Sequence, residues 1–466
     1  MPSTINSTTT GVKVTSDSSG ALNIQVGGTN AIEIGANASV VIGNLALPTS
    51  LTLTTLNATS ASITTLSATS LTVSSPQVFP AGSASAPAVT TTGDTNTGIY
   101  FPAADQVAVT TGGTVAAGFN SNGLFFRNRI INGDMRIDQR NAGAAVTVGG
   151  AYSVDRFFTV NNTDGAYSAQ QDTSVPAGSG FINSVKFTTT TADATLAATQ
   201  NCHFDQAIEG TNVADLMWGT ANARTVTLSF WVRSSLTGTF GGVLRNSAFN
   251  RAYPYTYTIS AADTWEYKTV TIPGDTTGTW LTTNGIGILV IFGLGAGVNR
   301  SGTAGAWNGN ANVSATGAVS VIGTLNATWY VTGVQLETGS VATPFERRPY
   351  GTELMLCQRY CVLIASGANK PIANSFYYSA TNVSGYLSFP VDMRATPTLS
   401  VVTGTNYYGN VANGGIDSLN SFTQDLRNER GIALYNNTEA SGTAGHGGYF
   451  YSQNAAGQVL VTAELV

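Results

Sequence analysis

The chain has 466 residues, of which 10% are charged and 42% hydrophobic, with a formal net charge of −5. Disorder requires low hydrophobicity together with high net charge, so this composition indicates a folded chain. Its 20 basic residues form no stripe that would neutralise phosphates, which argues against nucleic-acid binding. The longest apolar run, 285–298, is shorter than the roughly 20 residues that cross a bilayer, so we expect no membrane insertion.

Residues 1–78 are predicted to form a β-repeat shaft or attachment region. The ten-residue blocks 54–63 and 64–73 both begin with Thr-Thr-Leu, carry Ala-Thr-Ser in the middle and end on an aliphatic residue. Such a repeat cannot bury its apolar face alone and needs neighbouring repeats or chains to cover it. We therefore expect an intertwined homotrimeric shaft, with a flexible Ser/Thr linker as the alternative. The first residues carry neither a basic nor an apolar segment, so no secretory signal is expected.

Residues 79–127 are predicted to be a small β-hairpin linker module, because two turn clusters frame two strands near Gly93 and Gly112. Residues 128–350 contain short strands separated by turns, without a strong helical period. These strands are expected at 225–233, 253–259, 266–272, 286–292, 319–322 and 329–336. The spacing predicts an antiparallel two-sheet sandwich or jelly roll.

Residues 351–466 are predicted to be a C-terminal β tip domain preceded by one short helix. The helix is expected over 352–361, with Thr352 as its cap. The helical spacing places Leu354, Cys357, Gln358 and Cys361 on one face. The two cysteines are interpreted as small buried hydrophobes rather than as a metal or redox pair. The expected fold class of the whole chain is all-β.

Two sets of residues could suggest a cofactor site or a catalytic site, but their spacing does not support either function. The glycines from Gly293 to Gly297 lack the third glycine and the helix of a dinucleotide fingerprint. His203 and His446 lack the spacing of zinc ligands, and we expect no metal, no cofactor and no catalytic residues.

Glycoside hydrolysis would need two carboxylates across a sugar bond. The candidates are Asp134, Asp138 and Asp155. Arginines surround these residues in the sequence, so ion pairing at a domain or chain interface is the preferred interpretation. We expect the protein not to be an enzyme.

Aromatic side chains carry the stronger functional signal, because sugar rings stack on flat aromatic faces. Alternation along 227–233 places Leu228, Phe230 and Val232 on one strand face and Ser229, Trp231 and Arg233 on the other. The candidate glycan-binding residues are Trp231, Arg233, Tyr253, Tyr255 and Trp307. Trp307 is expected to be exposed in a Gly/Asn loop, and Trp265 and Trp329 to lie in the core. The alternative is that Trp231 and the tyrosines pack in the second sheet or in a trimer interface.

Several segments resemble parts of bacteriophage tail fibres in the order found there. Residues 127–140 are similar to the opening of a fibre module, and residues 333–346 are similar to its closing strand. Residues 356–360 resemble the helix that follows, and residues 389–398 a signature of the C-terminal domains. The resemblance implies a trimeric tail fibre or appendage with a carbohydrate-binding-module-like jelly roll.

A fibre of this kind would be a virion component that is assembled in the host cytoplasm. It would attach through other virion tail or adaptor proteins at its N-terminus, and it would bind a host surface glycan or outer-membrane receptor. The alternatives are a polysaccharide-degrading tailspike and a structural virion appendage without receptor binding.

Overall fold

The computed structural model describes strands between residues 13 and 41, and then residues 78–102, 106–119 and 127–465. The chain divides into two compact units, Met1–Gln77 and Val78–Val466. The first unit contains an antiparallel meander of β1 (Lys13–Ser16), β2 (Leu22–Val26), β3 (Thr29–Ile34) and β4 (Val40–Val41). The predicted repeat at 54–73 lies outside the described residues, so the trimeric shaft stays a prediction.

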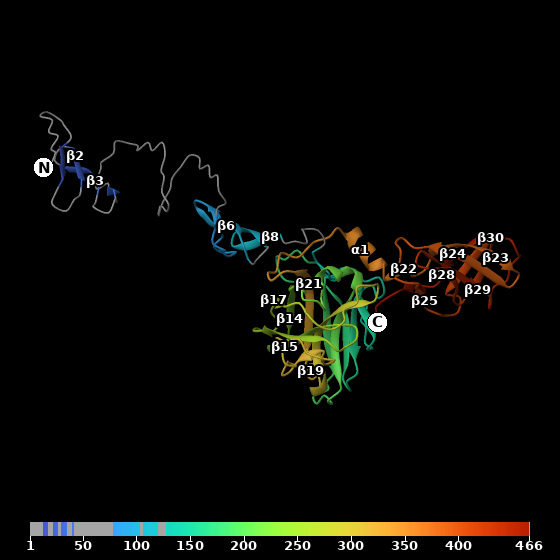
Figure 1. The fold of residues 1–466 in the computed structure, drawn as a ribbon. Coiled ribbons are helices and arrows are strands. Elements are labelled where there is room, and N and C mark those ends of the chain that lie inside the picture. Colours follow the sequence, from blue (N-terminus) through green and yellow to red (C-terminus); the bar gives the residue numbers. More distant parts are fainter. Residues whose placement is uncertain are drawn as a thin grey trace. The chain divides into compact units, whose positions relative to one another are not determined.

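The second unit begins with four antiparallel strands in sequential order (Figure 1). They are β5 (Val89–Thr91), β6 (Asp94–Tyr100), β7 (Val107–Thr111) and β8 (Thr114–Phe119). The sequence predicted only two of them. Gly93 and Gly112 adopt positive φ inside tight turns, so each turn cluster joins two strands instead of bounding one.

A two-sheet antiparallel sandwich follows, as predicted. One sheet has six strands in the order β16 (Ala252–Ile259), β15 (Gly238–Arg245), β18 (Ile286–Ala296), β13 (Asn201–Glu209), β10 (Phe157–Asn161) and β9 (Ala151–Val154). The other has five, in the order β11 (Ala166–Asp172), β12 (Ser184–Thr191), β21 (Thr328–Thr338), β14 (Val226–Ser234) and β17 (Glu266–Ile272). Short connections include η1 (Gly210–Asn212), η2 (Ala214–Leu216), η3 (Val298–Arg300) and the parallel pair β19 (Ser301–Gly302) and β20 (Ser314–Ala315).

Aromatic rings from both sheets meet in the core of the sandwich. Phe230 of β14 lies edge-on to Phe292 of β18, with ring centroids 5.0 Å apart. Trp329 of β21 is fully buried beside Phe204 and Phe292. The expectation of a buried Trp329 is confirmed, whereas Trp265 is only half-buried, beside Tyr330.

One predicted strand is absent from the described sandwich. Residues 319–322 form a loop, although Val321 and Ile322 are fully buried. The amide of Ile322 donates to the carbonyl of Leu294, and the Thr189 hydroxyl donates to the carbonyl of Val321. The apolar signal therefore came from a loop that inserts its side chains into the core.

The helix α1 (Tyr350–Gln358) leads into the C-terminal β region. It begins two residues earlier than predicted, with Pro349 at its N-cap position, so Thr352 is not the cap. Cys357 and Cys361 are fully buried, as expected, and Cys202 lies in the sandwich core. Among the described residues, no helix has both the length and the apolar character needed to cross a membrane.

Two antiparallel sheets follow the helix. The smaller has the order β22 (Cys361–Ser366), β31 (Gln458–Thr462) and β25 (Thr398–Val401). The larger has the order β27 (Gly415–Leu419), β26 (Tyr408–Ala412), β30 (Gly447–Ser452), β23 (Lys370–Ser379), β24 (Asn382–Ser388), β29 (Gly431–Asn436) and β28 (Thr423–Asn428). Side chains from both sheets share one apolar core.

A buried charge cluster joins the sandwich to the segment after β31. Glu464 accepts hydrogen bonds from Arg140, at 2.6 Å, and from Arg156. Arg140 also lies 3.5 Å from Asp155, and the Arg156 guanidinium stacks 3.6 Å from the ring centroid of Tyr360. These contacts hold the last strand of the C-terminal region against the sandwich.

The three acidic residues that were candidates for glycoside hydrolysis form ion pairs or hydrogen bonds within the fold. Asp134 pairs with Arg136 at 3.1 Å, and Asp155 with Arg140, as the interpretation of ion pairing expected. Asp138 forms no such pair with a described residue and accepts hydrogen bonds from Asn141 and from the amide of Gly143 instead.

We expect Asp155 to make stability depend on pH. Burial raises its pKa from 3.8 to about 6, although Arg140 and Gln139 oppose the rise. The folded state thus favours the protonated acid, so this contribution to the free energy of unfolding is complete below about pH 4 and is lost as the pH rises through about 6. Asp155→Asn cannot ionise and should gain stability relative to wild type over this range, by up to about 3 kcal/mol for two pKa units.

Urea unfolding of both proteins at several pH values between about 4 and 7 would measure this difference. Parallel stability curves would contradict the prediction. The informative quantity is how the difference in the free energy of unfolding changes with pH. Its absolute value is not used, because the substitution also changes the hydrogen bonds from Gln139.

Candidate functional site

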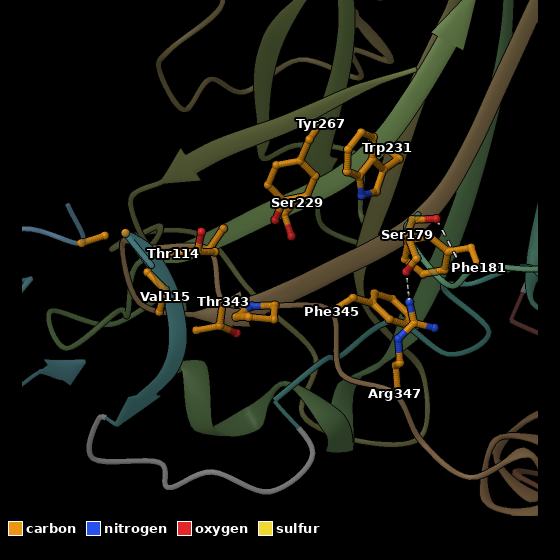
Figure 2. Close-up of a pocket in the computed structure, with 15 residues that line it drawn as sticks. Thr114, Val115, Ser179, Phe181, Ser229, Trp231, Tyr267, Thr343, Phe345 and Arg347 are labelled. Carbon is orange, nitrogen blue, oxygen red and sulfur yellow. Dashed lines mark hydrogen bonds between the residues drawn. The ribbon is translucent and has the colours of Figure 1, made fainter. Parts of the chain in front are cut away.

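A groove with a volume of about 610 Å³ lies on the outer face of the five-stranded sheet. Figure 2 shows Trp231 and Tyr267 on one side of it and Phe181, Phe345 and Arg347 on the other. Thr114 and Val115 of β8 contribute to its lining.

The strand alternation that was predicted for β14 places Trp231 in this groove. Leu228, Phe230 and Val232 are fully buried in the core, so Trp231 projects from the opposite face of the strand. It is half-buried and directly opposes Tyr267 on β17, with ring centroids 5.4 Å apart and planes at 48°. Tyr267 is 43% exposed, so both rings offer a face to a ligand.

A β-bulge makes room for these rings. The β14–β21 register shifts between Ser229 and Trp231, and Gly333 on β21 adopts φ +62° at this point. A Cβ atom at Gly333 would lie 2.6 Å from Phe181 and 3.3 Å from Trp231. Glycine therefore provides both the backbone conformation and the space that bring the two walls together.

The opposite wall comes from the loops that precede β12 and follow β21. Phe181 and Phe345 pack edge to face at 5.1 Å, and the Arg347 guanidinium lies 4.7 Å from the ring centroid of Phe181. Arg347 donates to the carbonyl of Ser179 (Figure 2) and to the carbonyl of Gly180, and these two bonds fix its position. The side chain remains exposed, so it presents donors at the edge of an apolar surface.

Besides Arg347, neutral hydroxyls supply polar groups of the groove. Burial raises the pKa of Tyr267, although a hydrogen bond with Ser229 opposes the shift, so the phenol stays neutral near pH 7. Thr343 already donates to Glu337 at 2.6 Å. None of the residues that line the groove in the described part of the chain is Asp or Glu. The described residues also contain no cluster of His, Cys, Asp and Glu that could hold a metal ion.

The other predicted site residues do not line this groove. Arg233 shares the outer face of β14, but it donates to Ser174 and pairs with Asp263 at 3.3 Å. Tyr253 and Tyr255 do share one face of β16, as predicted, but that face is the core. Tyr255 is 1% exposed and donates to the carbonyl of Ile291, so its ring is closed to a ligand.

Trp307 is packed rather than exposed, contrary to expectation. Its indole lies 5.3 Å from Trp218, 5.5 Å from Trp280 and 5.2 Å from Tyr253. Its Nε1 donates to the carbonyl of Pro273 at 2.8 Å. The Gly/Asn loop around it folds back over the aromatic cluster, which composition does not reveal.

Four aromatic or charged groove residues escaped the sequence analysis: Phe181, Tyr267, Phe345 and Arg347. The alternation of β17 could have identified Tyr267, because its neighbours across the sheet were already predicted. Loop residues Phe181, Phe345 and Arg347 carry no periodic signal, since their positions depend on contacts distant in sequence.

Two of the segments that resemble tail fibres, 127–140 and 333–346, are joined by hydrogen bonds close to the groove. The Glu346 carboxylate accepts hydrogen bonds from the amides of Arg127 and Asn128, and Asn128 accepts from the amide of Leu336. Gln335 donates to Glu337 and accepts from the amide of Glu346. These contacts fix the loop that carries Phe345 and Arg347, and the segment 333–346 also contributes Gly333, Thr343 and Phe345 to the lining of the groove.

No protein-family model matches the chain, and no curated protein sequence matches it. Among solved structures, the chain is similar to the enzymatically active domain of tailspike protein 4 from bacteriophage CBA120, at 11% identity over 46% of this chain and 22% of that one, with a TM-score of 0.26. It is also similar to a CBM4 module, at 15% identity over 45% of this chain and 98% of that one, with a TM-score of 0.25.

A third similar structure is a family 11 carbohydrate-binding module from Clostridium thermocellum in complex with a mixed-linked tetrasaccharide. The identity is 11% over 44% of this chain and 99% of that one, and the TM-score is 0.22.

Proposed function

We propose that this protein is a non-enzymatic adhesin of a phage tail fibre, which attaches the virion to a host cell by binding a surface glycan in the groove. The observation that carries the proposal is the pair formed by Trp231 and Tyr267, two adjoining rings held open on a sheet face. Sugars present flat apolar faces bordered by hydroxyls, which match aromatic rings next to polar groups. Arg347 and the Tyr267 hydroxyl supply such polar groups at the edge of the rings.

The chemistry of the groove favours binding over cleavage. Hydrolysis of a glycosidic bond uses a carboxylic acid and a carboxylate on either side of that bond. The groove residues in the described ranges contain neither. Asp134, Asp138 and Asp155 are held by arginines or by backbone amides.

We also propose that three copies form the fibre, joined by the repeats at residues 54–73, and that other virion proteins hold its N-terminus. Three sites on one particle would convert weak binding of one glycan into firm attachment. This arrangement would use the exposed groove without requiring tight binding at any single site.

Solution mass and polysaccharide turnover test the proposal together. Light scattering on the purified chain should give about 144 kDa, three times the 48.1 kDa of one copy. The trimer should bind host cells and should release no reducing ends from host polysaccharide. A stable monomer would contradict the shaft, and release of reducing ends would favour the tailspike alternative.

A further inference from the structure

A second pocket, of about 340 Å³, lies on the outer face of the six-stranded sheet and so on the other side of the sandwich from the groove. His203 and Asp205 of β13 and Phe158 of β10 line it, together with Arg245, Phe249 and Arg300. These residues project outward because Phe204 and Phe157, their neighbours in the strands, point into the core.

Arg245 is the unusual member of this pocket. It ends β15 and is only 8% exposed, yet no carboxylate in the described part of the chain lies within ion-pair distance of it. One Nη donates to the carbonyl of Asn312 at 3.3 Å, the guanidinium stacks 4.3 Å from the Phe249 ring centroid, and the buried Nε has no hydrogen-bond partner. Burial lowers its pKa to about 10, so it remains charged at neutral pH.

The one acidic residue that lines the pocket, Asp205, favours the charged form of Arg245 through its own charge but forms no ion pair with it. Asp205 lies 3.2 Å from His203, and the other ring nitrogen of His203 contacts Asn201 at 3.0 Å. A second guanidinium, that of Arg300, is half-buried at the rim and donates to the carbonyl of Thr199. Two guanidinium groups thus face a pocket with a single, already engaged carboxylate.

We propose that this pocket binds the carboxylate of an acidic sugar, such as a uronic or sialic acid residue of a host glycan. A guanidinium presents two parallel donors that match a carboxylate, and a buried unpaired Arg supplies them in a site of low dielectric. Phe158 and Phe249 also line the pocket and offer apolar surface to the sugar ring. The pocket is separate from the groove. It would allow the protein to recognise an acidic sugar unit in addition to the sugar bound in the groove.

Isothermal titration of the full chain with galacturonate and N-acetylneuraminate tests the assignment, with glucose and inorganic phosphate as the comparison ligands. We expect millimolar binding of the acidic sugars that weakens with added salt, and none of glucose or phosphate at this site. Arg245→Gln should weaken binding at least tenfold, and Arg300→Gln should weaken it severalfold. Arg430→Gln removes the same charge from an exposed pair with Asp392 and should leave binding unchanged.

The melting temperature separates a binding role from a structural one. Arg245→Gln removes a buried charge that has no acidic partner, so its melting temperature should equal or exceed that of wild type. A lowered melting temperature with unchanged uronate binding would overturn the proposal, and so would phosphate binding as tight as uronate binding. If Arg245→Gln does not fold, Arg300→Gln at the rim provides the test. An unchanged uronate affinity in Arg300→Gln would then overturn the proposal. Trp231→Ala should bind uronate as wild type does. This result would show that the second pocket binds its ligand independently of the groove.

Discussion

Trp231→Ala should weaken glycan binding by about 30-fold per site, which corresponds to about 2 kcal/mol for the loss of a central aromatic contact. The indole and the Tyr267 ring together form one wall of the groove, and alanine leaves Tyr267 without its neighbour. Because the ring lies outside the core, the melting temperature should change little. Cell-binding assays on the intact oligomer would magnify the loss, since several weakened sites act together.

Trp307→Ala is the matched control for this variant. Trp307 packs among Trp218, Trp280 and Tyr253, so its truncation should cost about 3–5 kcal/mol of stability. Binding per folded molecule should be unchanged below the melting transition. If Trp231→Ala instead melts as early as Trp307→Ala and binds normally while folded, Trp231 is a packing residue and the groove is not the site.

Glu464→Gln should produce the second large effect, a loss of about 3–5 kcal/mol of stability. The side chain of Glu464 is 5% exposed, and it receives hydrogen bonds from Arg140 and Arg156, whose side chains are 12% and 1% exposed. Glutamine keeps the shape but leaves the Arg156 guanidinium without a carboxylate partner. Breaking a buried pair costs far more than the pair contributes, because the remaining charge stays desolvated.

Denaturant unfolding of Glu464→Gln would measure this loss. Asp392→Asn is the control, because it breaks an exposed pair with Arg430 and should cost less than about 1 kcal/mol. Equal effects of the two substitutions would show that the buried cluster does not hold the C-terminal region to the sandwich.

Much of the fold was predictable because strands have a period of two. Along β14 that period alone separated Leu228 and Phe230 in the core from Trp231 outside it. The same reasoning placed Tyr253 and Tyr255 together but could not decide whether their shared face was core or surface. That decision depends on which sheet packs against the strand, and one strand does not contain this information.

The rest of the site depends on contacts between distant residues. Phe345 and Arg347 reach the groove because Glu346 is held by the amides of Arg127 and Asn128, more than 200 positions away in the sequence. Residues 319–322 were mistaken for a strand because buried loops and strands share the same apolar composition. Local patterns therefore identified Trp231 but missed Tyr267 beside it and the opposite wall, which long-range hydrogen bonds assemble.

The three buried thiols can report local unfolding of the regions in which they lie. Cys202 lies in the sandwich core, whereas Cys357 and Cys361 lie at and just after the helix that joins the sandwich to the C-terminal sheets. Burial raises the pKa of each thiol, so the reactive thiolate is scarce while the chain is folded. Alkylation by a thiol reagent would thus be limited by how often each region opens. Mass spectrometry could then time the opening of the sandwich and of the helix region separately, without any engineered label.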